Sequence, residues 1–149
     1  MGTRMKGIKA IGHVAIRVKD VEPSLDFYVN RLGFPEMFRL DRDGKLWIVY
    51  LKITDSQFLE IFPDSAGDTA PSRDVVGYNH MCIEVEDLEA VVAELEAAGV
   101  EIVQALKTGD DGNRQAWIRD PDGHYIELMQ MMPGCNQYEA ISRLKGQPA

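Results

Sequence analysis

The chain has 149 residues, 45% of them apolar, so it can bury a core as one compact domain or as two very small ones. Sixteen basic against 24 acidic residues give a formal net charge of -8, which has the wrong sign for binding nucleic acid or an anionic membrane surface. No apolar run approaches the roughly 20 residues of a membrane span, and the start lacks a signal-peptide pattern, so we expect a cytoplasmic protein.

A strand followed by a helix is predicted near the start of the chain. Residues 13–20 alternate as a half-buried strand does, and residues 21–32 have apolar side chains at helical spacing. Asp20 is placed to cap this helix, Pro23 suits its first turn, and Gly33 is expected to end it. Three further strands are then predicted, around residues 36–40, 46–53 and 57–62. The first part of the chain therefore has a β-α-β-β-β pattern.

The same pattern returns later in the chain. The octets starting at His13 and His80 share His, Ile, Val and Asp at matching offsets and lie 67 residues apart. The second octet precedes a predicted helix and three strands, at residues 88–98, 101–105, 114–119 and 125–129. We therefore predict an α+β fold in which two tandem βαβββ modules form a curved mixed sheet around a cavity. The predicted parts are a first module at 8–64, a linker at 63–76, a second module at 77–130 and a C-terminal appendage at 131–149 with a short helix.

One histidine and one glutamate occupy equivalent positions in the two modules. His13 and His80 begin the first strands, and Glu60 and Glu127 interrupt the apolar last strands, each 47 residues after its histidine. Because strand side chains alternate, the aliphatic neighbours would face the helices and these four would face the cavity. A divalent cation would remove the repulsion between two close carboxylates. We therefore predict a metal site with all four as ligands, for nickel, zinc or cobalt by preference.

The segments that carry these residues resemble the vicinal oxygen chelate superfamily. This superfamily includes glyoxalase I, methylmalonyl-CoA epimerase, extradiol dioxygenases and bleomycin-binding members. The resemblance covers about residues 8 to 130, and its marks are the stretches 12–15, 24–28, 32–34, 79–80 and 120–128. Trp47 and Trp117 lie in what we take as matched middle strands, and either could line the cavity.

The resemblance implies a metal-dependent lyase or isomerase similar to glyoxalase I, that is, of the lactoylglutathione lyase type. Glu127 would then be the base, with Glu60 as its counterpart, and the proton would be transferred through a metal-held enediolate. A methylmalonyl-CoA epimerase-like enzyme is the alternative, and a non-catalytic ligand-binding module or a dioxygenase of the same fold is a further one. The expected partner is a small molecule, either a glutathione adduct or a CoA thioester.

Three cations are candidates for binding such a substrate. Arg17 matches the arginine that in bacterial glyoxalase I-like enzymes meets the γ-glutamyl carboxylate of glutathione. Lys107 and Arg114 complete the set, because a chain with a charge of -8 needs local cations to attract an anion. We also expect a homodimer, because a sheet of about four strands exposes an edge, and in many family members modules from two chains complete each other.

Overall fold

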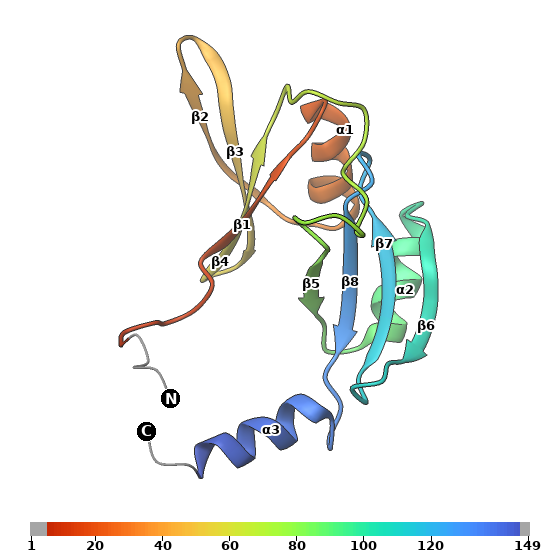
Figure 1. Ribbon diagram of the computed structural model, residues 1–149. Coiled ribbons are helices and arrows are strands. Elements are labelled where there is room, and N and C mark those ends of the chain that lie inside the picture. The colour runs from red at the N-terminus through yellow and green to blue at the C-terminus, as the bar shows by residue number, and fades with distance from the viewer. Residues whose placement is uncertain (1–5, 147–149) are drawn as a thin grey trace.

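The computed structural model describes residues 6–146, which form two modules of the same topology followed by a helix (Figure 1). The first module consists of β1 (His13–Arg17), α1 (Val21–Leu25), η1 (Asp26–Arg31), β2 (Glu36–Arg42), β3 (Lys45–Thr54) and β4 (Gln57–Phe62). The second consists of β5 (Met81–Glu84), α2 (Leu88–Ala97), β6 (Ile102–Thr108), β7 (Arg114–Arg119) and β8 (Tyr125–Gln130). The predicted α+β fold with two tandem βαβββ modules is confirmed.

The helix of each module begins at an aspartate and ends before a glycine, as predicted. The Asp20 carboxylate accepts a hydrogen bond from the backbone N–H of Glu22, and the Asp87 carboxylate accepts one from the backbone N–H of Ala90. Gly33 and Gly99 have φ angles of 79° and 77°, a region in which a side chain would be strained. These local signals fix where each helix starts and stops.

Each module has its own four-stranded sheet, in which the last strand lies beside the first. The strand orders are β1-β4-β3-β2 and β5-β8-β7-β6, with β1 parallel to β4 and β5 parallel to β8. This pairing places Ala15 beside Glu60 and Cys82 beside Glu127. β1 and β5 are therefore edge strands of their sheets. His13 is the first residue of β1, and His80 directly precedes β5.

The aliphatic residues that flank the two glutamates are buried, as the alternation predicted. The exposed fraction is 0% for Leu59, Ile61 and Ile126 and 3% for Leu128. They belong to a single hydrophobic core that contains residues of both modules. The two sheets are thus parts of one packed unit, and α2 covers one face of the second sheet (Figure 1).

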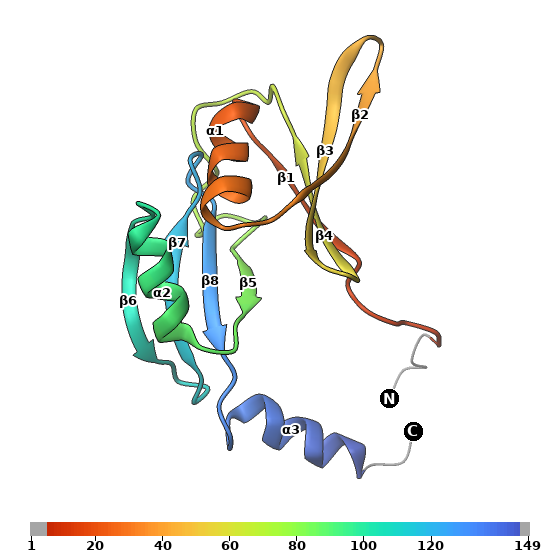
Figure 2. The same cartoon turned by 180° about the vertical axis from the view of Figure 1, so that it is seen from behind.

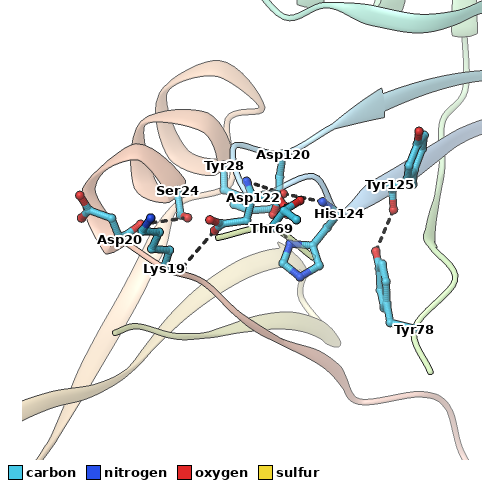
Figure 3. Close-up of polar contacts among 10 residues, drawn as sticks. All are labelled: Lys19, Asp20, Ser24, Tyr28, Thr69, Tyr78, Asp120, Asp122, His124 and Tyr125. Atoms are coloured by element: carbon cyan, nitrogen blue, oxygen red, sulfur yellow. Dashed lines mark hydrogen bonds and ion pairs between the residues drawn. The ribbon is translucent and has the colours of Figure 1, made fainter. Parts of the chain in front are cut away.

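A buried group of polar side chains also joins the modules (Figure 3). The Tyr28 hydroxyl of η1 donates a hydrogen bond of 2.9 Å to Asp120 Oδ2, in the turn between β7 and β8. The His124 backbone N–H donates to Asp120 Oδ1, and His124 Nδ1 lies 2.8 Å from Asp120 Oδ2. Asp120 is 5% exposed and His124 8% exposed. We call Tyr28, Asp120 and His124 the clasp, because they fix the first module to the second.

The last described element, α3 (Asn136–Lys145), extends beyond both sheets (Figure 2). Its first turn is attached to the second module, since Asn113 donates to Gln137 and Gln137 donates to Asp111. Within residues 6–146, no helix has the length and apolar character needed to cross a membrane.

Candidate functional site

His13 and Glu60 form a pair in the first module. Their Nε2 and Oε2 atoms lie 3.4 Å apart, and the side chains are 51% and 10% exposed. Tyr50 lies opposite Glu60 in the β3–β4 ladder, and interaction with the Glu60 carboxylate raises the pKa of the Tyr50 hydroxyl. We call His13, Tyr50 and Glu60 the first half-site. Of the two predicted ligands in this half-site, Glu60 is much less exposed than His13.

His80 and Glu127 form the equivalent pair in the second module. Their Nε2 and Oε2 atoms lie 3.0 Å apart, and the side chains are 30% and 15% exposed. Trp117 pairs with Glu127 across the β7–β8 ladder, and its ring meets the His80 ring edge-on at 4.7 Å between centroids. We call His80, Trp117 and Glu127 the second half-site. In this half-site the histidine is the ligand with the additional side-chain contact. The counterpart of Trp117 in the first module is Tyr50 rather than Trp47, because Tyr50 and Trp117 each lie opposite the glutamate of their own module.

The neighbouring Asn79 orients the His80 ring. Asn79 Nδ2 donates to the backbone carbonyl of Arg73 at 3.4 Å, so Asn79 Oδ1 faces His80 Nδ1, at 2.5 Å. An amide oxygen can only accept, and therefore Nδ1 carries the hydrogen. In the uncharged ring Nε2 then has a free lone pair that points at the Glu127 carboxylate. Two acceptors at this distance require a proton or a cation between them.

Cys82 lies beside Glu127, where Ala15 lies beside Glu60 in the first module. Burial raises the pKa of the Cys82 thiol to about 12, and the negative charge of Glu127 adds to the shift. The thiol therefore stays protonated at neutral pH, and a protonated thiol is a poor metal ligand and a poor nucleophile. Cys82 is free, as is the buried Cys135.

Within one chain the four predicted ligands lie as two separate pairs. Among residues 6–146, no three His, Cys, Asp or Glu side chains are close enough together to hold a metal ion. His13 and His80 both line a cavity of about 750 Å³ between the modules, whereas Glu60 and Glu127 are not part of its lining. A single chain thus has two half-sites that do not meet.

The three predicted substrate-binding cations lie apart from these half-sites. The Arg17 guanidinium lies 5.4 Å from the Phe62 ring and lines a different cavity, of about 510 Å³, beside the linker. Lys107 is on β6, the strand of the second sheet farthest from β5. Arg114 pairs with Glu89 of α2, at 2.6 Å, and so lies on the helix-covered side of the sheet.

Arg73, which belongs to the predicted linker at residues 63–76, lies close to the second half-site. Its guanidinium carbon is 3.7 Å from the centroid of the Tyr125 ring and 5.2 Å from that of Trp117. Residues 63–76 have no strand or helix periodicity, so no sequence signal indicated where this side chain would lie.

Comparison with known proteins gives one family match and related sequences. The family model described as Glyoxalase/Bleomycin resistance protein/Dioxygenase superfamily matches residues 10–128. A lactoylglutathione lyase of Pseudomonas putida is 30% identical over 147 residues, covering 81% of this chain and 84% of that protein. The uncharacterized protein YaeR of Escherichia coli is 32% identical over 130 residues, covering 85% and 99%.

Among solved structures, a glyoxalase family protein from Enterococcus faecalis is similar to this chain. Its TM-score is 0.72 at 34% sequence identity, and the match covers 81% of this chain and 97% of the other. The family match ends at residue 128, so α3 lies outside it.

Proposed function

This chain belongs to the glyoxalase/bleomycin resistance protein/dioxygenase superfamily, and we propose that it is a metal-dependent lyase of the lactoylglutathione lyase type. One observation carries the proposal: His80 Nε2 lies 3.0 Å from the Glu127 carboxylate, while its Nδ1 faces the Asn79 amide oxygen. Relatives named lactoylglutathione lyase, at about 30% identity, give further support.

The spacing and chemistry of both pairs fit a divalent ion. Neighbouring ligands that each lie about 2.1 Å from a cation are roughly 3 to 3.4 Å apart, and the two Nε2–Oε2 distances are 3.0 and 3.4 Å. Imidazole and carboxylate together suit nickel, zinc or cobalt. When bound, the ion would polarise a carbonyl oxygen of the substrate and so make the adjacent C–H bond more acidic.

We further propose that each metal site is completed by a second copy of the chain. The shared core and the buried clasp fix the two modules of one chain, so its half-sites cannot close on each other without breaking these contacts. β1 and β5 are edge strands, and such edges tend to pair with another chain. His13 and Glu60 of one subunit would then act with His80 and Glu127 of the partner subunit.

The different neighbours of the two glutamates suggest different roles. Glu60 lies opposite Tyr50 on the neighbouring strand and is buried, with 7% of its surface exposed. Glu127 lies beside the weak thiol donor of Cys82 and faces His80, and its side chain is 15% exposed against 10% for Glu60. Glu127 is therefore the proposed base, which takes a proton from one substrate carbon and returns it to the neighbouring one.

The near symmetry of the half-sites favours a second candidate function, an epimerase similar to the methylmalonyl-CoA enzyme. An epimerase needs a base on each face of the substrate, and each half-site offers one carboxylate. Two assays on the nickel-, zinc- or cobalt-loaded protein separate the candidates. Turnover of methylglyoxal with glutathione supports the lyase, and deuterium exchange into methylmalonyl-CoA supports the epimerase.

Complementation between two inactive variants tests the shared site. One variant carries His13→Ala and Glu60→Gln, and the other carries His80→Ala and Glu127→Gln. If sites form between chains, a mixed dimer regains one site with all four ligands, so metal binding and activity return on co-refolding. If each site forms within one chain, no combination restores either. Metal content of the unmodified protein below roughly a tenth of an equivalent per chain after reconstitution would contradict the metal site itself.

A further inference from the structure

We propose that Arg73 is a substrate-positioning residue that binds a carboxylate group of an anionic substrate at the second half-site. The inference deepens the proposed function and rests on it, because it assigns to that site the chemical class of its substrate. It rests on three observations: the face on which Arg73 lies, its lack of an ion pair, and its connection to His80.

The guanidinium of Arg73 lies over the same face of the second sheet as Glu127. Trp117 is the cross-strand neighbour of Glu127, and Tyr125 lies two residues before Glu127 on β8, so the three side chains share one face. Arg73 covers the Tyr125 and Trp117 rings at 3.7 and 5.2 Å. A group bound by Arg73 would therefore lie beside the ligand pair and above an aromatic floor.

Arg73 forms no ion pair with any described residue, since no carboxylate within residues 6–146 lies within 4 Å of its guanidinium. Four other arginines do pair with carboxylates: Arg31 with Asp26, Arg39 with Glu36, Arg114 with Glu89 and Arg119 with Glu101. On a chain with a net charge of -8, an exposed and unneutralised cation beside a site provides local attraction for an anion.

The aromatic contact and the backbone of Arg73 both position it for this role. A guanidinium that packs on an aromatic ring keeps the N–H groups at its edge free for a two-point contact with a carboxylate. The Arg73 carbonyl accepts the hydrogen bond from Asn79, whose other amide atom orients His80. The arginine and the histidine ligand are thus held in one connected group, so the carboxylate and the reacting part of the substrate would be placed together.

Binding of a charged and a neutralised tripeptide tests the proposal. In a Trp47→Phe background Trp117 is the single tryptophan, so its fluorescence reports directly on the ring beneath Arg73. The full-length protein is titrated with S-methylglutathione, whose thiol is blocked, and with its diethyl ester, which lacks both carboxylate charges. The reference protein should bind the acid more tightly than the ester.

Arg73→Ala should weaken binding of the acid about ten-fold, the size expected for losing one charge-assisted contact, and should leave the ester unaffected. Arg73→Lys should recover part of the loss, because it keeps the charge without the planar fork. Arg42→Ala is the matched control: Arg42 also lies over an aromatic side chain, at position 47, where the natural Trp47 ring is 3.4 Å away and Phe replaces it in this background, but it is near the tip of the β2–β3 hairpin. It should change neither affinity.

Equal affinity of the acid for the reference protein and for Arg73→Ala would overturn the inference, and so would equal affinity of acid and ester for the reference protein. Unchanged thermal unfolding and metal content in Arg73→Ala would show that the loss comes from binding. The titration requires neither turnover nor the identity of the metal. A protein that binds the acid through Arg73 but has no lyase activity would contradict the proposed function and leave this inference intact.

Discussion

The two half-sites carry the same ligands but support them differently. In the second, Asn79 and Trp117 fix His80, whose side chain is 30% exposed. In the first, the His13 side chain is 51% exposed, whereas Glu60 is 10% exposed and lies opposite Tyr50. The repeat thus keeps the ligand positions, while the residue opposite each glutamate differs: Tyr50 lies opposite Glu60, and Trp117 lies opposite Glu127 and contacts His80.

A site built from one half of each kind would combine a fixed histidine with a fixed glutamate. The remaining two ligands, His13 and Glu127, have fewer supporting contacts and would retain freedom to move. This arrangement suits an enzyme in which one carboxylate holds the ion and the other transfers protons.

The largest expected effect distinguishes the two glutamates. Glu127→Gln should lower kcat by about 10²- to 10⁴-fold, because an amide can still lie near the ion but cannot accept a proton. Glu60→Gln should lower metal affinity more and kcat less, since that carboxylate is the more buried of the two and is proposed only to hold the ion. Steady-state kinetics and metal analysis of both variants measure this. Equal kcat losses in the two variants would mean that the glutamates share the base function.

The support of His80 gives the next largest effect. Asn79→Ala should weaken metal affinity about 10- to 100-fold, the usual cost of removing a group that orients a ligand. Asn30→Ala is the control, because Asn30 donates a similar amide hydrogen bond to Asp26 on an exposed helix surface. Competition with a metal chelator measures both affinities. A variant at Asn79 that binds metal normally would remove the distinction drawn between the two histidines.

The clasp, which keeps the half-sites of one chain apart, should contribute measurably to stability. Tyr28→Phe removes a buried hydrogen bond to the Asp120 carboxylate and should lower the free energy of unfolding by about 1.5 to 3 kcal/mol. Urea unfolding measures the change. Tyr138→Phe, on the exposed side of α3, should be nearly neutral, and a similar loss there would show a nonspecific effect.

The smallest effect is a pH dependence of the same clasp. Burial lowers the pKa of His124, but the hydrogen bond and negative charge of Asp120 outweigh it, so the folded pKa is raised. The stability that this adds is fully present below the unfolded pKa of His124 and is lost as pH rises through the folded pKa. The difference in unfolding free energy between the reference protein and His124→Ala should therefore be larger at about pH 5.5 than at about pH 8. No change between the two would show that His124 keeps one protonation state.

The features of this protein that depend on local order could be predicted from its residues alone. Helix caps, strand alternation and the 67-residue repeat indicated the helices and strands of the described residues within a few residues, and they placed the histidine and the glutamate of each module at equivalent positions on its first and last strands. These features depend on residues that are close together along the chain and on a pattern of strands and helix that occurs once in each module. The same information indicated the superfamily, because its motifs are short segments of this kind.

How these parts combine became visible in the folded chain. The tertiary structure separated the two ligand pairs, matched Tyr50 with Trp117, buried the clasp and brought Arg73 from the linker onto the second half-site. None of these has a period or a motif in the sequence. They depend on how two modules pack against each other and on the path of an irregular segment, which are set by contacts between residues far apart in the chain.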